Sequence, residues 1–242
     1  MIRWNDTDIQ ATVTELRRLD KYTVTFRLEI PGYGVTQEYL EEDEEHSEFQ
    51  NLQINFPGAY WGKTARDFHW NCYGTDTGNV RDIINAFVRK FEKFKEQGIG
   101  LFICSHTKGT GKTLLACCLG NEIIERYHAA VRFISAVEYA EMTKNKEDVS
   151  RIRDAGILIL DDIGAEDTRE WTVDRMRDLV NHRYQEHLLT IFTSNRSWDS
   201  THADDLIHSR IYGMSVPVAL PEISIREKQA DERIRDFVSS VL

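Results

Sequence analysis

The chain has 242 residues, 41% hydrophobic and 29% charged, which suits one α/β core of ordinary size plus a small additional unit. Its formal net charge of −10 disfavours indiscriminate binding to nucleic acid, because that affinity comes from neutralising phosphates. No apolar run approaches the length of a membrane span, and the first ten residues lack the features of a signal peptide. We therefore expect a cytoplasmic protein without membrane contact. The four cysteines show no CxxC spacing, and we expect them to be reduced thiols.

Residues 1–56 are predicted to form a small separate unit, and residues 57–242 one larger domain. Apolar and polar side chains alternate over residues 22–30, which indicates a half-buried strand. Pro31 and Gly32 predict a turn, and the acidic run at 41–45 predicts a loop or an exposed face. We expect two or three strands and one helix here. Because so short a unit is marginal alone, it should pack on the rest or bind a partner.

Residues 57–79 mix aromatic and turn residues without a period, which predicts an ordered connection against the core. Asn79 is then expected to cap an amphipathic helix that Gly98 ends. The apolar positions on one face of this helix are Val80, Ile83, Ile84, Phe87, Val88, Phe91 and Phe94.

A candidate phosphate-binding loop, residues 104–113, lies between a predicted strand at 99–103 and a predicted helix at 112–128. Glycines let the backbone approach a phosphate closely, and a helix N-terminus favours anions. In the GxxxxGK[S/T] pattern, Lys112 would reach the β- and γ-phosphates and Thr113 would place a hydroxyl on Mg²⁺. The residues expected around the nucleotide are His106, Lys108, Gly109, Thr110, Gly111, Lys112, Thr113 and Leu114.

His106 stands where the pattern has its first glycine. Histidine is among the few other residues enriched at positive φ, so we predict an altered but functional loop. The alternative is a chance glycine-lysine turn, which the strand before it and the helix after it disfavour.

Two carboxylates follow the second strand predicted after the loop. After a strand at 131–134, a helix at 137–143 and a polar segment at 144–153, an apolar strand at 157–160 ends in Asp161 and Asp162. A P-loop ATPase keeps its Mg²⁺-organising Asp at such a position. Asp161 would act on the Mg²⁺ shell, and Asp162 would orient the attacking water or accept its proton. The alternative is that both merely end a strand at the solvent.

The last third of the chain continues the alternation of helix and strand. A helix at 171–187 precedes a strand at 188–193, which is followed by Asn195. That residue could hydrogen-bond the attacking water or the γ-phosphate, or simply belong to a strand-end turn. A helix at 204–212 contains Arg210, an edge strand at 216–220 contains Pro217, and a final amphipathic helix spans 230–241.

Several stretches resemble the DnaC/DnaI-type bacterial helicase loaders, AAA+ ATPases that have the IstB transposition helpers as close relatives. They are KGTGKTLLA (108–116), ILILDDIGAE (157–166), NHRYQEHLLTIFTSN (181–195) and SRI (209–211), and FPGAYWGKTARDF (56–68) is similar to the segment entering the ATPase domain. The resemblance implies that Lys112 and Thr113 are the Walker A pair and Asp161 and Asp162 the Walker B carboxylates. It also makes Asn195 sensor 1, and Arg210 an arginine finger supplied to the ATP of a neighbouring subunit. A surface partnership of Arg210 with Asp204 or Asp205 remains the alternative.

The resulting hypothesis is an α/β protein with a P-loop AAA+ core, a five-stranded parallel sheet flanked by helices, and a small N-terminal partner-binding unit. The resemblance implies an ATPase that uses ATP and Mg²⁺ to load a hexameric replicative helicase onto single-stranded DNA, with weak or conditional DNA contact and self-association through Arg210. Two alternatives remain: an IstB-type transposition helper acting on duplex DNA, and a nucleotide-gated adaptor with little turnover, which His106 would permit.

Overall fold

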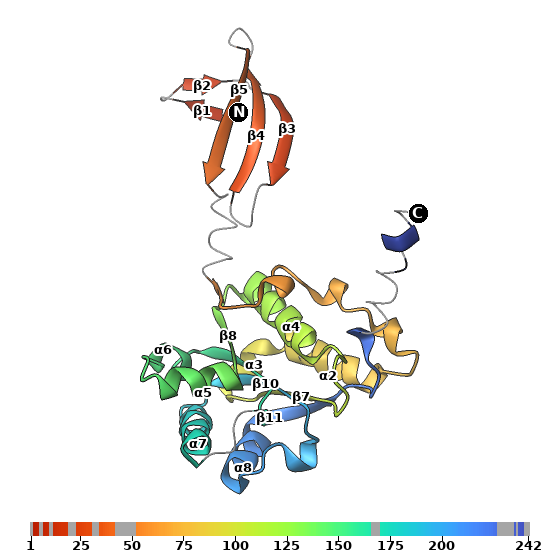
Figure 1. Cartoon of the computed structure of the whole chain (residues 1–242), viewed down its shortest axis with the longest axis vertical. Coiled ribbons are helices and arrows are strands. Elements are labelled where there is room, and N and C mark those ends of the chain that lie inside the picture. Colours follow the sequence, from red (N-terminus) through yellow and green to blue (C-terminus); the bar gives the residue numbers. More distant parts are fainter. Residues whose placement is uncertain are drawn as a thin grey trace. The chain divides into compact units, whose positions relative to one another are not determined.

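The computed structural model describes residues 52–165, 170–226, Arg235 and 237–239, together with the backbone of five strands between residues 2 and 41. The chain divides into two compact units, Met1–Asn51 and Leu52–Leu242 (Figure 1). The sequence division lay five residues later, between 56 and 57. Within the described residues, no helix is long and apolar enough to cross a bilayer.

The N-terminal unit is built from antiparallel strands. Strand β1 (Ile2–Trp4) pairs with β2 (Thr7–Ile9), and a separate sheet has the order β3 (Thr12–Arg18), β4 (Thr23–Ile30), β5 (Gly34–Glu41). Strand β4 confirms the strand expected from the alternation at 22–30. The expected two or three strands are too few, since five are described. The predicted turn at Pro31 and Gly32, and most of the acidic run, lie outside the described residues.

The second unit is an α/β fold around a parallel sheet, as predicted. Its six strands run in the order β11 (Ser215–Ala219), β7 (Gly100–Cys104), β10 (Leu189–Ser194), β9 (Ile157–Asp161), β8 (Val131–Ser135), β6 (Gln53–Ile54). The predicted count of five is wrong by one, because β6 has only two residues and shows no period. Pro217 lies on the edge strand β11, where its missing N–H leaves no gap in the ladder.

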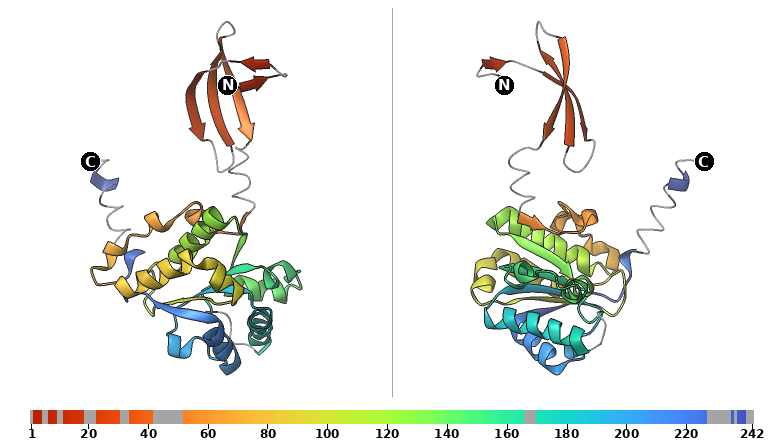
Figure 2. Two further views of the ribbon diagram at one scale, coloured as in Figure 1. Left: turned by 180° about the vertical axis from the view of Figure 1, so that it is seen from behind. Right: turned by 60° about the vertical axis from the view of Figure 1, so that its left-hand side comes forward.

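Helices cover both faces of this sheet (Figure 2). Helices α2 (Gly78–Arg89), α3 (Phe91–Glu96) and α4 (Lys112–Tyr127) lie on one face. On the other, α5 (Ala136–Lys144), α6 (Ser150–Arg153), α7 (Glu170–Gln185) and α8 (Asp205–Met214) enclose a buried cluster that includes Phe102, Leu158, Met176, Phe192 and Ile211. Short 3-10 helices are Gly58–Tyr60, Ala65–Asp67, Trp70–Tyr73 and Trp198–Ser200. The phosphate loop joins β7 to α4 at the carboxyl edge of the sheet.

The helix predicted over residues 80–94 is two helices, because Lys90 leaves helical geometry with φ −113° and ψ 24°. Its expected cap is also wrong: Thr77 is the N-cap residue and Asn79 lies in the first turn. Gly98 follows α3 with a φ of +62°, and a Cβ there would lie 2.6 Å from the backbone of His187. Of the helix predicted at 230–241, only Arg235 and 237–239 lie in the described part, and these are helical.

Candidate nucleotide-binding site

Two glycines shape the loop between β7 and α4. Gly109 and Gly111 have φ values of +77° and +92°, a region that side chains with a Cβ disfavour. Space is short as well: a Cβ at Gly109 would lie 2.8 Å from Ser224 Oγ, and one at Gly111 would lie 2.8 Å from Ile225 Cδ1. Both positions therefore need glycine for backbone conformation and for packing.

Beside this loop lies a cavity of about 540 Å³, a volume typical of small-molecule sites. It brings together the predicted residues Lys108, Gly109, Thr110, Gly111, Lys112, Thr113, Leu114, Asp161, Asp162 and Asn195. Pro57, Tyr60, Phe133, Thr193, Ile225 and Arg226 complete its lining. Two predicted site residues, His106 and Arg210, do not line the cavity.

Thr113 and Asp161 meet across the sheet edge. The Thr113 hydroxyl donates to Asp161 Oδ1 at 2.9 Å, and the Thr193 hydroxyl donates to the same oxygen at 2.5 Å. Burial raises the pKa of Asp161, against the two hydroxyl hydrogen bonds, which lower it. A bound cation would favour the ionised carboxylate.

The oxygens of Thr113 and Asp161 suit Mg²⁺, which prefers hard oxygen ligands and usually takes only one or two from protein. In the described part of the chain, no group of three or more His, Cys, Asp or Glu side chains forms an all-protein metal cage. A Mg²⁺ ion held here would therefore complete its coordination with phosphate oxygens and water.

Asp162 is oriented by Thr193 on β10 and by Asn195, which follows that strand. Its backbone is left-handed, with a φ of +59°, and its N–H donates to Thr193 Oγ1 at 2.8 Å. The Asn195 side-chain amide donates to Asp162 Oδ1 at 2.6 Å. The predicted pair of a carboxylate and an amide thus forms one hydrogen-bonded unit on the cavity wall.

Lys112 is 7% exposed, and its ammonium is bound within the loop. It donates to the carbonyl oxygens of Ser105 at 3.1 Å and Thr107 at 3.0 Å. Burial lowers the pKa of Lys112, whereas the nearby carboxylates of Asp162 and Glu222 raise it. The third N–H of the ammonium makes only a long contact, 3.5 Å to Thr110 Oγ1, so a phosphate oxygen can take that place while both carbonyl hydrogen bonds stay.

His106 does not adopt the positive φ that we expected from its place in the pattern. Its side chain is exposed, and its backbone N–H donates to Glu222 Oε1 at 2.9 Å. Because the turn here is not left-handed, a residue with a Cβ is accommodated. The tolerance of histidine therefore has a different cause from the predicted one.

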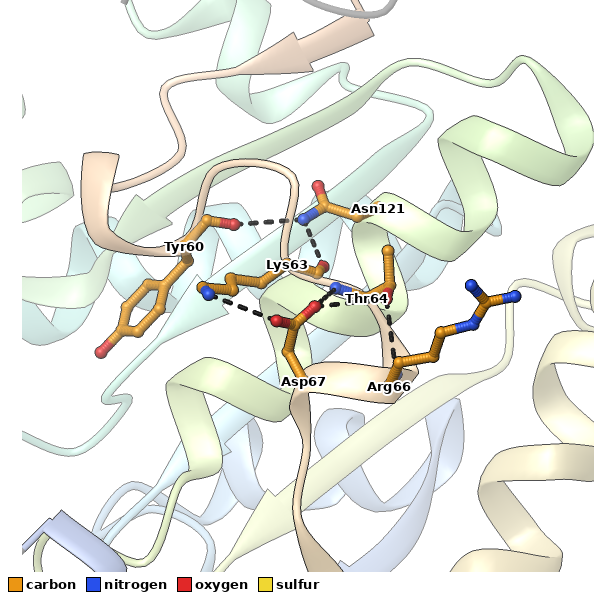
Figure 3. A network of polar contacts seen from close by, with 6 residues as sticks. All are labelled: Tyr60, Lys63, Thr64, Arg66, Asp67 and Asn121. Carbon is orange, nitrogen blue, oxygen red and sulfur yellow. Dashed lines mark hydrogen bonds and ion pairs between the residues drawn. The ribbon is translucent and has the colours of Figure 1, made fainter. Parts of the chain in front are cut away.

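The sequence predicted an ordered connection against the core at 57–79, but not that its aromatic residues lie beside the loop. Tyr73 donates from its hydroxyl to the carbonyl of Thr110 at 2.5 Å, and Tyr60 lines the cavity. Figure 3 shows how the segment around Tyr60 is held. The buried side chain of Asn121 on α4 donates to the carbonyls of Tyr60, at 3.1 Å, and Lys63, at 2.6 Å. A capping box between Thr64 and Asp67 closes the next turn. The signal available in sequence was the cluster of aromatics at 57–73.

Arg226 was also missed, because it follows the last strand without any recognisable spacing. It lines the cavity with Tyr60, whose pKa is raised by burial and lowered by this guanidinium. A guanidinium at this wall could pair with phosphate oxygens.

Arg210 lies on α8 and is not among the residues that line the cavity. Its Nε donates to Asn181 Oδ1 at 3.1 Å, and its guanidinium lies 4.6 Å from the centre of the Tyr184 ring. Asp204, an alternative partner in the sequence interpretation, pairs with Arg177 at 2.7 Å.

The fold and the site together define a P-loop nucleotide-binding protein with the AAA+ core. More narrowly, the chain belongs to the family of IstB-like ATP binding proteins, whose model matches residues 74–216.

Comparison with individual proteins agrees with this family. The replicative helicase loader DnaI of Bacillus subtilis (strain 168) is 30% identical over 117 residues, which are 45% of this chain and 37% of the loader. The crystal structure of DnaI superposes with a TM-score of 0.57 at 22% identity, covering 69% of this chain and 96% of that one. The DnaC helicase loader gives 0.56 at 22% identity, covering 68% and 99%. The chain is thus homologous to these loaders, although it spans well under two thirds of the curated relative's length.

Proposed function

We propose that this protein is an ATPase that loads a hexameric replicative helicase onto single-stranded DNA in the cytoplasm, with ATP binding and hydrolysis gating assembly and release. The proposal is carried by one observation: Lys112, Thr113, Asp161, Asp162 and Asn195 line a single cavity. These are the phosphate, cation and water-orienting groups that hydrolysis of a phosphoanhydride needs. The homology to DnaI and DnaC supports the loading role.

The proposed roles follow from the contacts of each group. Lys112 binds the phosphates, and Thr113 and Asp161 hold Mg²⁺, which would neutralise charge on the phosphate oxygens. Asp162, held by Asn195, orients the attacking water and accepts its proton. Arg210 serves the ATP of a neighbouring subunit, since it lies outside the lining of its own cavity.

The output of the cycle is a change in partner affinity, which requires the ATP and ADP states to differ in their contacts with the partner. We assign helicase recognition to the N-terminal unit, because its separation from the ATPase core suits a partner-binding module. Contact with single-stranded DNA would be weak or conditional, because the net charge of −10 opposes phosphate binding outside a local basic surface.

The test is ATP turnover by the purified protein, alone and with single-stranded DNA plus the replicative helicase of its host, with complex formation followed by light scattering. Turnover that depends on these partners, with a defined complex, supports a loader. Tight ATP binding without turnover or helicase association would instead indicate a nucleotide-gated adaptor.

A transposition helper is the second candidate, because the matched family is described as IstB-like. Such a helper would share the catalytic residues and act on duplex DNA. Replacing the single strand by a duplex in the same assay separates the two: strong duplex binding and duplex-stimulated turnover would favour the helper, which the acidic composition opposes.

A further inference from the structure

Residues 220–226, which we call the C-terminal strap, run beside the phosphate loop after strand β11. At one end, the N–H of Leu220 donates to the carbonyl of Cys104 at 2.8 Å. At the other, the N–H groups of Ile225 and Arg226 donate to the carbonyl of Gly109 at 3.0 and 3.1 Å. The strap is therefore hydrogen-bonded to Cys104 and to Gly109, which delimit the first half of the loop.

Between these anchors, the carboxylate of Glu222 accepts three hydrogen bonds from consecutive loop residues. The donors are the Ser105 hydroxyl at 3.0 Å, the His106 N–H at 2.9 Å and the Thr107 N–H at 2.6 Å. Although burial acts in the opposite direction, these bonds lower the pKa of Glu222 to about 2. The carboxylate is thus ionised over the whole physiological range, and its contacts do not depend on pH there.

The same loop residues are held from the other side by Lys112, through the carbonyls of Ser105 and Thr107. An ammonium has three N–H donors, so Lys112 can reach a phosphate with the donor that now makes the 3.5 Å contact to Thr110 Oγ1 and keep both carbonyls. Glu222 holds the N–H groups of His106 and Thr107, which a cation cannot bind. Glu222, His106 and Thr107 are all absent from the cavity lining. The Glu222 carboxylate therefore binds the loop from outside the cavity and does not occupy the place of a phosphate.

We infer that Glu222 is a positioning residue for nucleotide binding: with Lys112 on the carbonyls and Glu222 on the N–H groups, residues 105–107 are held in the shape that binds the nucleotide. The Glu222 carboxylate fixes the backbone of residues 105–107, as a tight glycine turn does in other phosphate loops. The loop therefore functions with His106 in place of the first glycine. The inference rests on the nucleotide-dependent function proposed above.

The experiment compares Glu222→Ala and Glu222→Gln with the full-length wild type, using titration with a fluorescent ATP analogue and steady-state turnover under assembling conditions. The alanine variant should bind about tenfold more weakly, the size expected when hydrogen bonds to a charged acceptor are lost. Glutamine keeps one acceptor oxygen without the charge, so it should recover part of that loss. The control is Glu125→Ala, an exposed glutamate on helix α4, which should bind as the wild type does.

Positioning is distinguished from a merely structural role by the kinetic parameters, because Glu222 does not touch the reacting groups. The Glu222 variants should raise KM and leave kcat within about twofold, the pattern of lost uniform binding. If the alanine variant does not fold, as judged by circular dichroism, the near-isosteric glutamine variant decides. Unchanged affinity in the Glu222 variants, or a fall in kcat at unchanged KM, overturns the positioning role alone. Absence of ATP binding by the wild type overturns the nucleotide function and this inference together.

Discussion

The hydroxyl of Thr113, in the first turn of α4, lies 2.9 Å from a carboxylate oxygen of Asp161, at the end of β9. Forty-eight positions separate the two residues in the chain, and the parallel sheet brings them to one edge. Each supplies an oxygen of the kind that Mg²⁺ selects. Their contact therefore links the phosphate loop to the strand that carries the proposed catalytic carboxylates.

Thr113→Val should remove the Mg²⁺-dependent part of ATP affinity, because valine keeps the shape of threonine and loses the hydroxyl. We expect binding with Mg²⁺ to weaken about tenfold, the lower end of losses seen when metal-site groups are removed. Titrations with Mg²⁺ and with a chelator measure this. In the chelator, wild type and variant should coincide, and Thr143→Val on α5 serves as the control. An equal loss in both conditions would mean that the hydroxyl acts on the nucleotide without a cation.

Asp162→Asn should leave ATP binding within about twofold of wild type and lower kcat by about 10² to 10⁴, the usual contribution of a general base. Asparagine tolerates the left-handed backbone at this position, and its side-chain oxygen still accepts from Asn195. The substitution therefore removes the negative charge and one acceptor oxygen while it keeps the backbone and the contact with Asn195. Single-turnover kinetics with saturating ATP checks the result. Wild-type turnover by this variant would mean that another group acts as the general base.

The residues of this site that could be predicted from sequence are those marked by a local sequence pattern. Apolar runs of four or five residues mark β7 and β9. Asp161 ends β9 and Asp162 follows it, whereas Lys112 and Thr113 begin α4 after the loop that follows β7. Because parallel strands end at the same edge, their order along the chain was enough to bring these residues together.

The rest depends on contacts that local patterns do not carry. Glu222 meets the loop across 115 to 117 positions, and nothing near it in sequence signals that contact. Strand β6 is too short for periodicity, and the side chain of its buried Gln53 donates to Asn121 on α4, 68 positions away. Tertiary hydrogen bonds, not intrinsic propensity, determine both features.

Asn121→Ala should destabilise the second unit, Leu52–Leu242, by about 2 to 4 kcal/mol, because it leaves buried polar groups without partners. Asn121 is fully buried, accepts from Gln53 Nε2 at 2.8 Å, and donates to the carbonyls of Tyr60 and Lys63. Urea unfolding measures the change. Asn85→Ala, at an exposed position on α2, should lie within about 0.5 kcal/mol of wild type. Equal stability of the two variants would show that water replaces the lost partners.

Lys112→Ala should abolish measurable nucleotide binding, with a loss of at least about thirtyfold, since it removes a buried cation from the cavity where we propose that the phosphates bind. A fluorescent ATP analogue provides the measurement, and Lys95→Ala, exposed on α3, is the matched control. Retained affinity in the Lys112 variant would mean that Lys108 or Arg226, which line the same cavity, carries the phosphate contact.

Arg210→Ala should spare ATP binding and remove hydrolysis, if its guanidinium completes the site of a neighbouring subunit. In its own subunit the side chain contacts Asn181 and Tyr184, so its loss leaves the cavity intact. The two inactive variants then complement each other. A Lys112→Ala subunit lacks bound ATP and still supplies Arg210, whereas an Arg210→Ala subunit binds ATP and lacks only the guanidinium.

In a one-to-one mixture that assembles at random, head-to-tail contacts would make about a quarter of the interfaces productive. Turnover should therefore rise from near zero in either variant alone to about a quarter of the wild-type rate on mixing. Normal turnover by Arg210→Ala alone under assembling conditions rules out the arginine finger. No recovery on mixing, with light scattering showing that mixed complexes form, would place the function of Arg210 within its own subunit, through its contacts with Asn181 and Tyr184 on α7.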